Sequence, residues 1–168
     1  MSRIYLLIIL LSIVSFKVSA QRVPEVPNTM LNDIAMVSWH QGSIPQLGIP
    51  MYQGPVIIYN PNVVSMAGPY ISAFFYAHEY CHIQLDHIRR RYFESNPYNM
   101  AWVSQGHESE ADSCATQNLL NQGNINAIRA AAQWFYGQGY IPQVASHPPG
   151  AARADNIVRT AKRMGVQL

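Results

Sequence analysis

The segment His78-Glu79-Tyr80-Cys81-His82 is an HExxH motif, the group of side chains in this sequence best suited to chemistry. On a helix, residues four positions apart lie on nearly the same face, so both imidazoles can bind one metal ion. Glu79 is turned by about 100° from His78, which places it beside such an ion, where it can accept a proton from water. The motif therefore predicts a metal site with a general base. A helix with two structural histidines is the alternative.

A catalytic zinc site also needs a third protein ligand and one open position. The acidic segment Glu108-Ser109-Glu110-Ala111-Asp112 can supply that ligand. Glu108 and Asp112 are four positions apart and share a helix face, whereas Glu110 lies about 160° from Asp112. The spacing predicts Glu108 as the ligand and Asp112 as the partner of a histidine ring N–H. A solvated acidic helix face is the alternative.

Two other histidines are not expected at the metal. His87 would lie about 180° from His78 on a continuing helix and would face away. The metzincin pattern, which supplies a third histidine, fails because this chain has Leu85 and Ile88 at the required Gly and His positions. His107 has no partner at ligand spacing, so it is expected to be an ordinary polar residue.

Glycine, proline and apolar periodicity predict the elements that must position these residues. A β-branched run at 56–59 ends in a turn and indicates a strand. Segment 30–39 fits a helix or a strand, 21–28 a poorly ordered lead-in, and 43–54 and 137–150 loops. Helices are predicted from Gly68-Pro69 towards Arg89, from about Gly106 to Leu120, from Asn124 through Phe135, and from Ala151 to Met164.

The N-terminus has the features of a secretory leader. Arg3 provides a positive charge, 6–16 an apolar stretch, and 18–20 a small-residue cleavage site. The apolar stretch is shorter than the roughly 20 residues that span a bilayer, although an uncleaved anchor is the alternative. We therefore expect 1–20 to be a signal peptide and 21–168 a single exported domain, periplasmic or secreted, without stable membrane insertion.

Composition and charge narrow the class of protein. Apolar residues make up 49% of the chain and charged residues 12%, which suits one packed core and excludes disordered and coiled-coil proteins. Arg3 and Lys17 lie in the leader, so the remaining basic and acidic side chains balance. A neutral chain without a basic stripe predicts no nucleic-acid binding. The run Arg89-Arg90-Arg91 is expected to be a solvated helix end.

The two cysteines of the chain, Cys81 and Cys114, lie close to predicted site residues. Their helices must approach each other if His82 and Glu108 are to share a metal ion. Because an exported protein enters an oxidising compartment, we predict that the cysteines form a disulfide. Two separate buried thiols are the alternative.

The pairing of AHEYCH at Ala77–His82 with ESEAD at Glu108–Asp112 resembles the HtpX-like and CAAX-prenyl-protease-type zinc metallopeptidases, which are gluzincins. The sequence SHPP at Ser146–Pro149, followed by Arg153, is similar to an element of the same family. The resemblance covers 56–157 and implies an α+β, mostly helical, zincin-like domain. The sequence departs from many members of the family in that we expect none of their membrane helices here. In that fold a small sheet has an edge strand along the cleft, matched here by substrate-binding residues Val56, Ile57, Ile58 and Tyr59.

The resemblance also implies an activity, that of a zinc-dependent endopeptidase acting on protein or peptide substrates. The implied ligands of the single zinc ion are His78, His82 and Glu108, with Glu79 as general base and Asp112 behind the ligands. His147 and Arg153 are candidates to stabilise the oxyanion, or His147 could occupy the open zinc position. A non-catalytic zinc-binding module is the alternative function.

Overall fold

The structure is a computed structural model that describes residues 22–141 and 145–168. The signal peptide predicted at 1–20 lies outside the described residues. In chain order the elements are β1 (Glu25–Pro27), β2 (Ala35–Ile44), the 3-10 helix η1 (Pro45–Leu47), β3 (Ile49–Tyr59), α1 (Pro61–Gln84), α2 (His87–Glu94), α3 (Met100–Asn121), α4 (Ile125–Tyr136) and α5 (Gly150–Arg163).

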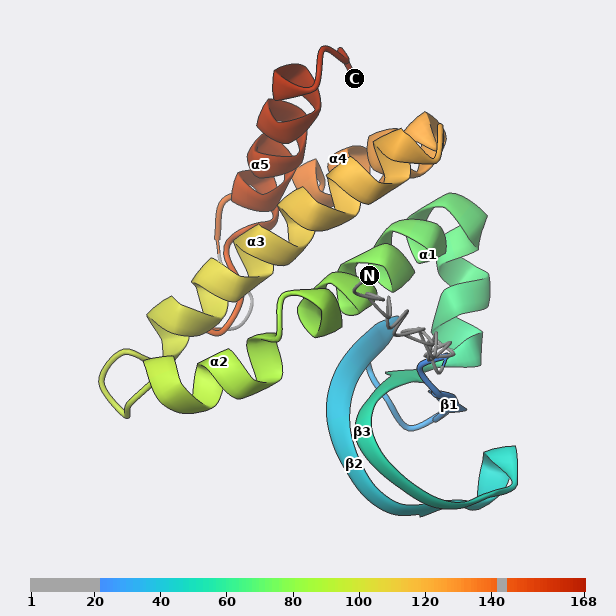
Figure 1. The fold of residues 1–168 in the computed structure, drawn as a ribbon. Helices are drawn as coiled ribbons and strands as arrows, with labels where there is room; N and C mark the ends of the chain where they lie inside the picture. Colours follow the sequence, from blue (N-terminus) through green and yellow to red (C-terminus); the bar gives the residue numbers. More distant parts are fainter. Residues whose placement is uncertain (1–21, 142–144) are drawn as a thin grey trace, which may run out of the picture.

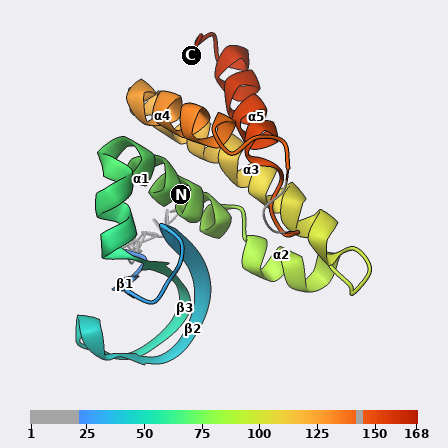
Figure 2. The ribbon, with the colours of Figure 1, turned by 180° about the vertical axis from the view of Figure 1, so that it is seen from behind.

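The architecture is α+β, as the sequence predicts. Helix α1 lies at the centre, with the small sheet against one side of it and α3 and α4 against the other (Figure 1). Helix α5 packs on α3 and α4, and the view from behind shows the same order of layers (Figure 2). No helix of the described chain is long and apolar enough to cross a bilayer.

The sheet is mixed and has the strand order β1-β3-β2. β1 runs parallel to β3, and β2 pairs antiparallel with β3 in a long curved hairpin closed by η1 (Figure 1). The predictions of a loop at 43–54 and of a poorly ordered lead-in at 21–28 are therefore wrong. Pairing with β3 gives β1 its ladder partners. Pairing between β2 and β3 continues through the Gly- and Pro-containing stretch to Gly42 and Tyr52, and resumes at Ile44 and Ile49. An irregularity between Gly42 and Ile44 absorbs the local break.

The prediction that residues 56–59 form the edge strand of the cleft is also wrong. They are the end of β3, which is central and pairs on both sides, so Val56 and Ile57 are buried. The edge strand on the helical side is β2, because the Val37 N–H points away from β3 and donates to Glu79 on α1. Local β-propensity located the strand, but only the pairing order decides which strand is at the edge.

Helix α1 begins earlier and ends earlier than predicted. Asn60 caps it, because its Oδ1 accepts a hydrogen bond of 2.9 Å from the Asn62 N–H. The predicted start at Gly68-Pro69 is a kink within the helix, where Gly68 has φ 81°. The helix stops at Gln84, and Asp86, with φ 56°, turns the chain into α2.

The helical core contains many alanines. Small side chains let helix axes approach closely, which brings polar side chains from different helices into contact at one buried place. Phe74 of α1 and Phe135 of α4 fill the centre, with ring centroids 6.2 Å apart. Fully buried alanines of α3, α4 and α5 are Ala111, Ala115, Ala127, Ala131, Ala154 and Ala161.

Candidate metal centre

Three side chains from α1 and α3 converge at the middle of the molecule. The Nε2 atoms of His78 and His82 are 2.9 Å apart, and the carboxylate oxygens of Glu108 lie 3.2 and 3.3 Å from them. A tetrahedral site with bonds of about 2.0–2.2 Å separates neighbouring ligand atoms by about 3.3–3.6 Å. These three residues could hold a metal ion, and the helix spacing that selected Glu108 is confirmed in this respect.

His78 is oriented by an acidic partner. Its Nδ1 lies 2.9 Å from the Asp112 Oδ1, and Arg153 of α5 donates two hydrogen bonds of 2.8 Å to the same carboxylate. Burial opposes protonation of His78, but the Asp112 and Glu108 carboxylates outweigh it and raise the pKa of His78 to about 10. Asp112 is fully buried, so Arg153 and His78 are needed to keep it ionised. Asp112 therefore lies behind the ligand, as the sequence predicts.

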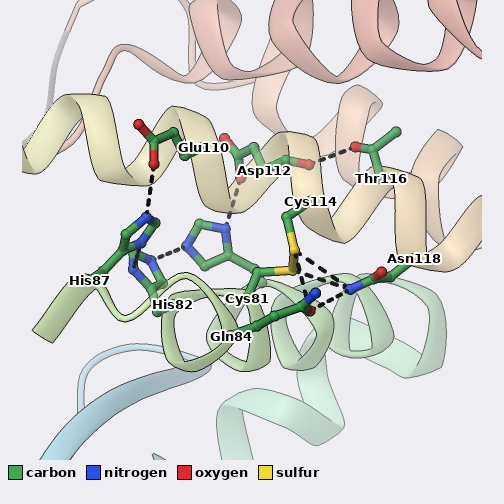
Figure 3. Close-up of a disulfide and its surroundings, with 10 residues drawn as sticks. Cys81, His82, Gln84, His87, Glu110, Asp112, Cys114, Thr116 and Asn118 are labelled. Atoms are coloured by element: carbon green, nitrogen blue, oxygen red, sulfur yellow. Dashed lines mark hydrogen bonds and ion pairs between the residues drawn. A yellow bond between two sulfur atoms is a disulfide. The ribbon is translucent and has the colours of Figure 1, made fainter. Parts of the chain in front are cut away.

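His82 is oriented by His87, which was expected to face away from the site on a continuing helix. Because α1 ends before His87, that histidine turns back, and its Nδ1 lies 2.9 Å from the His82 Nδ1 (Figure 3). The His87 Nε2 in turn lies 3.1 Å from the Glu110 Oε2. Burial lowers the pKa of His87 to about 4, so the ring is neutral. Its Nδ1 can therefore accept a hydrogen bond from the Nδ1–H of His82. The expectation that His87 faces away is wrong.

Further contacts with α2 and α3 hold His87 in place. The imidazole of His107 stacks on it with centroids 4.3 Å apart and an interplanar angle of 3°. His107 is 2.9 Å from Glu94, and Arg90 joins Glu94 and Glu110 with contacts of 2.8 and 2.6 Å. His107 is therefore buried in the support of the site, contrary to the expectation of an ordinary polar residue. The sequence indicated this role of His107 only by its position, one residue before Glu108 on the predicted ligand helix.

Glu79 is separate from the ligand set. Its Oε2 accepts a hydrogen bond of 2.7 Å from the Val37 N–H of β2. Burial raises the pKa of Glu79 above its usual range, against the opposing effect of His78 and His82. A carboxylate held beside the metal ligands, with a raised pKa, is suited to accept and return a proton.

The three candidate ligands line a cleft of about 610 Å³ between β2 and the helices, together with Glu79, His87 and His107. His147 and Pro148, from the segment before α5, line the same cleft. The His147 Nε2 and the Arg153 Nη2 each lie 3.6 Å from the Glu108 Oε2. Arg153 is buried and held by Asp112, whereas His147 is partly exposed. The predicted substrate strand 56–59 does not line the cleft, where 34–37 take its place.

Cys81 and Cys114 are joined as a disulfide between α1 and α3 (Figure 3). Their Cα atoms are 5.9 Å apart, and the bridge spans 33 residues of sequence. Cys81 is adjacent to His82, and Cys114 follows Asp112 by two positions. The bridge therefore ties together the two helices that carry the three candidate ligands.

Comparison with known proteins adds no identification. No protein-family model, no curated protein and no solved structure matches this chain.

Proposed function

We propose that this protein is a zinc-dependent metalloendopeptidase with a zincin-like fold, similar to the HtpX-like and CAAX-prenyl-protease-type gluzincins. The observation that carries the proposal is that α1 and α3 together hold three candidate ligands and, apart from them, one further carboxylate. His78, His82 and Glu108 present their ligand atoms to one point, while Glu79 lies outside that set. A site that only stabilises the fold has no use for a carboxylate held beside the ligands.

The donor set supports zinc. Two imidazole nitrogens and one carboxylate match the ligands of catalytic zinc sites, which keep a fourth position open. Hard cations such as Mg²⁺ and Ca²⁺ prefer sites made entirely of oxygen. A zinc ion held by these residues would supply Lewis-acid polarisation of the scissile carbonyl and acidify a water molecule.

The protein's own residues would then move protons and orient the substrate. Glu79 accepts the proton of the attacking water and returns it to the leaving amine. Its hydrogen bond to Val37 fixes the carboxylate relative to β2. Arg153 and His147, both close to Glu108, are the candidate donors for the oxyanion.

The edge of β2 is suited to an extended protein or peptide substrate. The N–H of Val37 points away from β3, so by strand alternation the backbone groups of Ala35 and Trp39 face the same free edge. Residues 34–37 line the cleft beside the ligands. A peptide that adds to this edge as a further strand gains main-chain hydrogen bonds and passes over the metal centre.

The N-terminal leader supports export as part of this proposal. A positive residue, a short apolar stretch and a small-residue cleavage site precede the described chain. The Cys81–Cys114 disulfide agrees with an oxidising compartment, periplasmic or extracellular.

The second candidate is a non-catalytic zinc-binding module. It is favoured by His147, whose Nε2 lies 3.6 Å from Glu108 and could close the site as a fourth ligand. In that case the site would hold zinc without an open position, and peptides would not be cleaved.

One experiment separates the two functions. The purified protein is assayed for zinc content and for cleavage of a mixed peptide library, before and after chelation and after zinc is returned. Metallopeptidase function predicts about one zinc per chain and cleavage that disappears with chelation and recovers with zinc. Stoichiometric zinc without cleavage, also in His147→Ala, would favour the binding module.

A further inference from the structure

The cleft extends beyond the ligands in two chemically different directions. Phe75 lies one helical turn before His78, and Trp134 packs edge-on against it with centroids 5.2 Å apart. That end of the cleft is aromatic. At the other end, past His82, the lining consists of Ile88 and Arg91 from α2 and Ser104 and His107 from α3.

Arg91 is the one arginine of α2 without an ion pair among the described residues. Arg89 pairs with Asp86 at 2.6 Å, and Arg90 pairs with Glu94 and Glu110 at 2.8 and 2.6 Å. The carboxylates next to Arg91 are therefore already paired with other arginines. Arg91 lines the cleft, so it gives that end a positive charge instead of forming only a solvated helix end.

A second residue that lines the cleft, on α3, has a polar group without a partner. Ser104 is 7% exposed, and its Oγ is the only buried side-chain polar atom of the described chain without a hydrogen bond. Buried hydroxyl groups are normally paired, so an unpaired one beside a cleft indicates a missing partner. His107, by contrast, is already bonded to Glu94.

We propose that Arg91, with Ser104 behind it, forms a subsite for a carboxylate group of the peptide substrate. The planar guanidinium binds carboxylates through two parallel hydrogen bonds, and Ile88 adds an apolar side chain to the lining of the cleft. The aromatic end around Phe75 and Trp134 takes an apolar side chain on the other side of the metal centre. This inference rests on the proposed peptidase function and specifies its substrate class.

The position of the subsite sets the distance from the reacting bond. Ser104 precedes Glu108 by one turn of α3, a rise of about 6 Å. An extended peptide covers that distance with about two residues. The carboxylate is therefore an Asp or Glu side chain close to the scissile bond, or the C-terminus of a short substrate.

Four variants of one parent peptide distinguish a side-chain carboxylate from a C-terminal carboxylate. Each has an aromatic residue, carries either Glu or Gln at the tested position, and ends in a free or an amidated C-terminus. Their binding is measured by calorimetry with the zinc-loaded Glu79→Gln variant, which removes the proposed base and leaves the ligands in place. We expect loss of the recognised carboxylate to weaken binding about tenfold or more, and the peptide pair that shows the loss names its source.

The matched pair of variants is Arg91→Glu and Arg89→Glu. Both reverse one charge on α2, but Arg89 is bound to Asp86 and does not line the cleft. Arg91→Glu should abolish the preference for a carboxylate, Arg91→Gln should remove most of it, and Arg89→Glu should retain it. Zinc content of each variant reports that the site is folded.

The possible outcomes separate this inference from the proposed function. Equal binding of all four peptides, or equal effects of the two charge reversals, overturns the carboxylate subsite. Cleavage by the wild-type protein without any carboxylate preference also overturns it but leaves the peptidase function in place. Carboxylate-dependent binding that requires Arg91, without cleavage by the wild-type protein, supports the subsite and contradicts the peptidase.

Discussion

At the scale of single residues, the two candidate ligand histidines are oriented by different chemistry. His78 faces a carboxylate fixed by Arg153, whereas His82 faces the neutral ring of His87, which is backed by Glu110. In both cases the Nδ1 partner leaves Nε2 free for a metal ion. The orientation of His82 therefore depends on a chain of two further side chains.

The HExxH motif and helix periodicity together predicted the candidate ligand triad and the position of Asp112. It could not predict His87, because the prediction assumed that the helix continues past Leu85. The left-handed backbone of Asp86, with φ 56°, breaks that helix and returns His87 to the site. A single non-helical residue decides this contact, and no apolar pattern reports it.

Glu108→Ala and Glu110→Ala should differ sharply in metal content. Glu108 lies 3.2 and 3.3 Å from the two ligand nitrogens, whereas Glu110 contacts His87 and Arg90. We expect loss of zinc from the Glu108 variant at concentrations where the Glu110 variant retains about one ion per chain. Metal analysis after gel filtration measures this, and the reverse order would place the ligand at Glu110.

His87→Phe should weaken zinc binding about 10 to 100-fold, because it removes the partner of His82. Phenylalanine preserves an aromatic ring for stacking on His107 but has no ring nitrogen. Competition with a chelating dye measures the affinity. His40→Phe, on the distal hairpin where the ring contacts Ser43, is the control and should bind as the wild type does. Equal affinities of the two variants would show that His87 does not support the ligand.

At the scale of elements, pairing between strands determines the shape of the sheet more than local sequence preference does. The curved hairpin includes Gly42, Gly48 and Gly54, whose local signal is that of a loop. Ladder hydrogen bonds between β2 and β3 override this signal. Helices α4 and α5 were predicted well because each has one apolar face that recurs at helical spacing. Helix α3 lacks such a face, and it begins at Met100 and not near Gly106.

Cys81→Ser should lower the free energy of unfolding by about 2–4 kcal/mol, because it opens a closed loop between α1 and α3. Since the bridge lies beside His82, zinc should also dissociate faster from the variant or from the reduced protein. Urea unfolding and zinc release rates measure the two effects. Intact mass after alkylation without reductant tests the bridge itself. Two alkylated cysteines in correctly exported, active protein would contradict it.

At the scale of the whole molecule, a buried charged centre lies where the sheet and the helices meet. The candidate ligands and the residues that support them come from α1, α2, α3 and α5, so binding of a metal ion here would be coupled to folding. The composition predicted one packed core. It could not predict that β2, rather than 56–59, forms the cleft edge, because strand order is a property of the assembled sheet.

His87 should make stability depend on pH when zinc is chelated. Burial lowers its pKa to about 4 in the folded protein, against about 6.5 in the unfolded chain. Between these values only the unfolded chain binds the proton, so the free energy of unfolding falls as the pH drops from about 6.5 to 4. The contribution is fully present above pH about 6.5 and amounts to about 1–3 kcal/mol.

Glu79, whose pKa is raised, acts in the opposite direction. The measurement is therefore the difference between the wild type and His87→Phe, obtained by urea unfolding with chelator at several pH values. The wild type should lose more stability towards acid than the variant. Parallel curves would mean that the folded protein protonates His87 as readily as the unfolded chain does.

The most direct test of the metallopeptidase proposal compares the wild type with Glu79→Gln at equal zinc content. The substitution preserves the size of the side chain and leaves His78, His82 and Glu108 in place, so both proteins should hold about one zinc ion per chain. Removing a general base typically costs about 10² to 10⁴-fold in rate. The proposal predicts a loss of that size in the rate of peptide cleavage. Cleavage by fully zinc-loaded Glu79→Gln at the wild-type rate would contradict it.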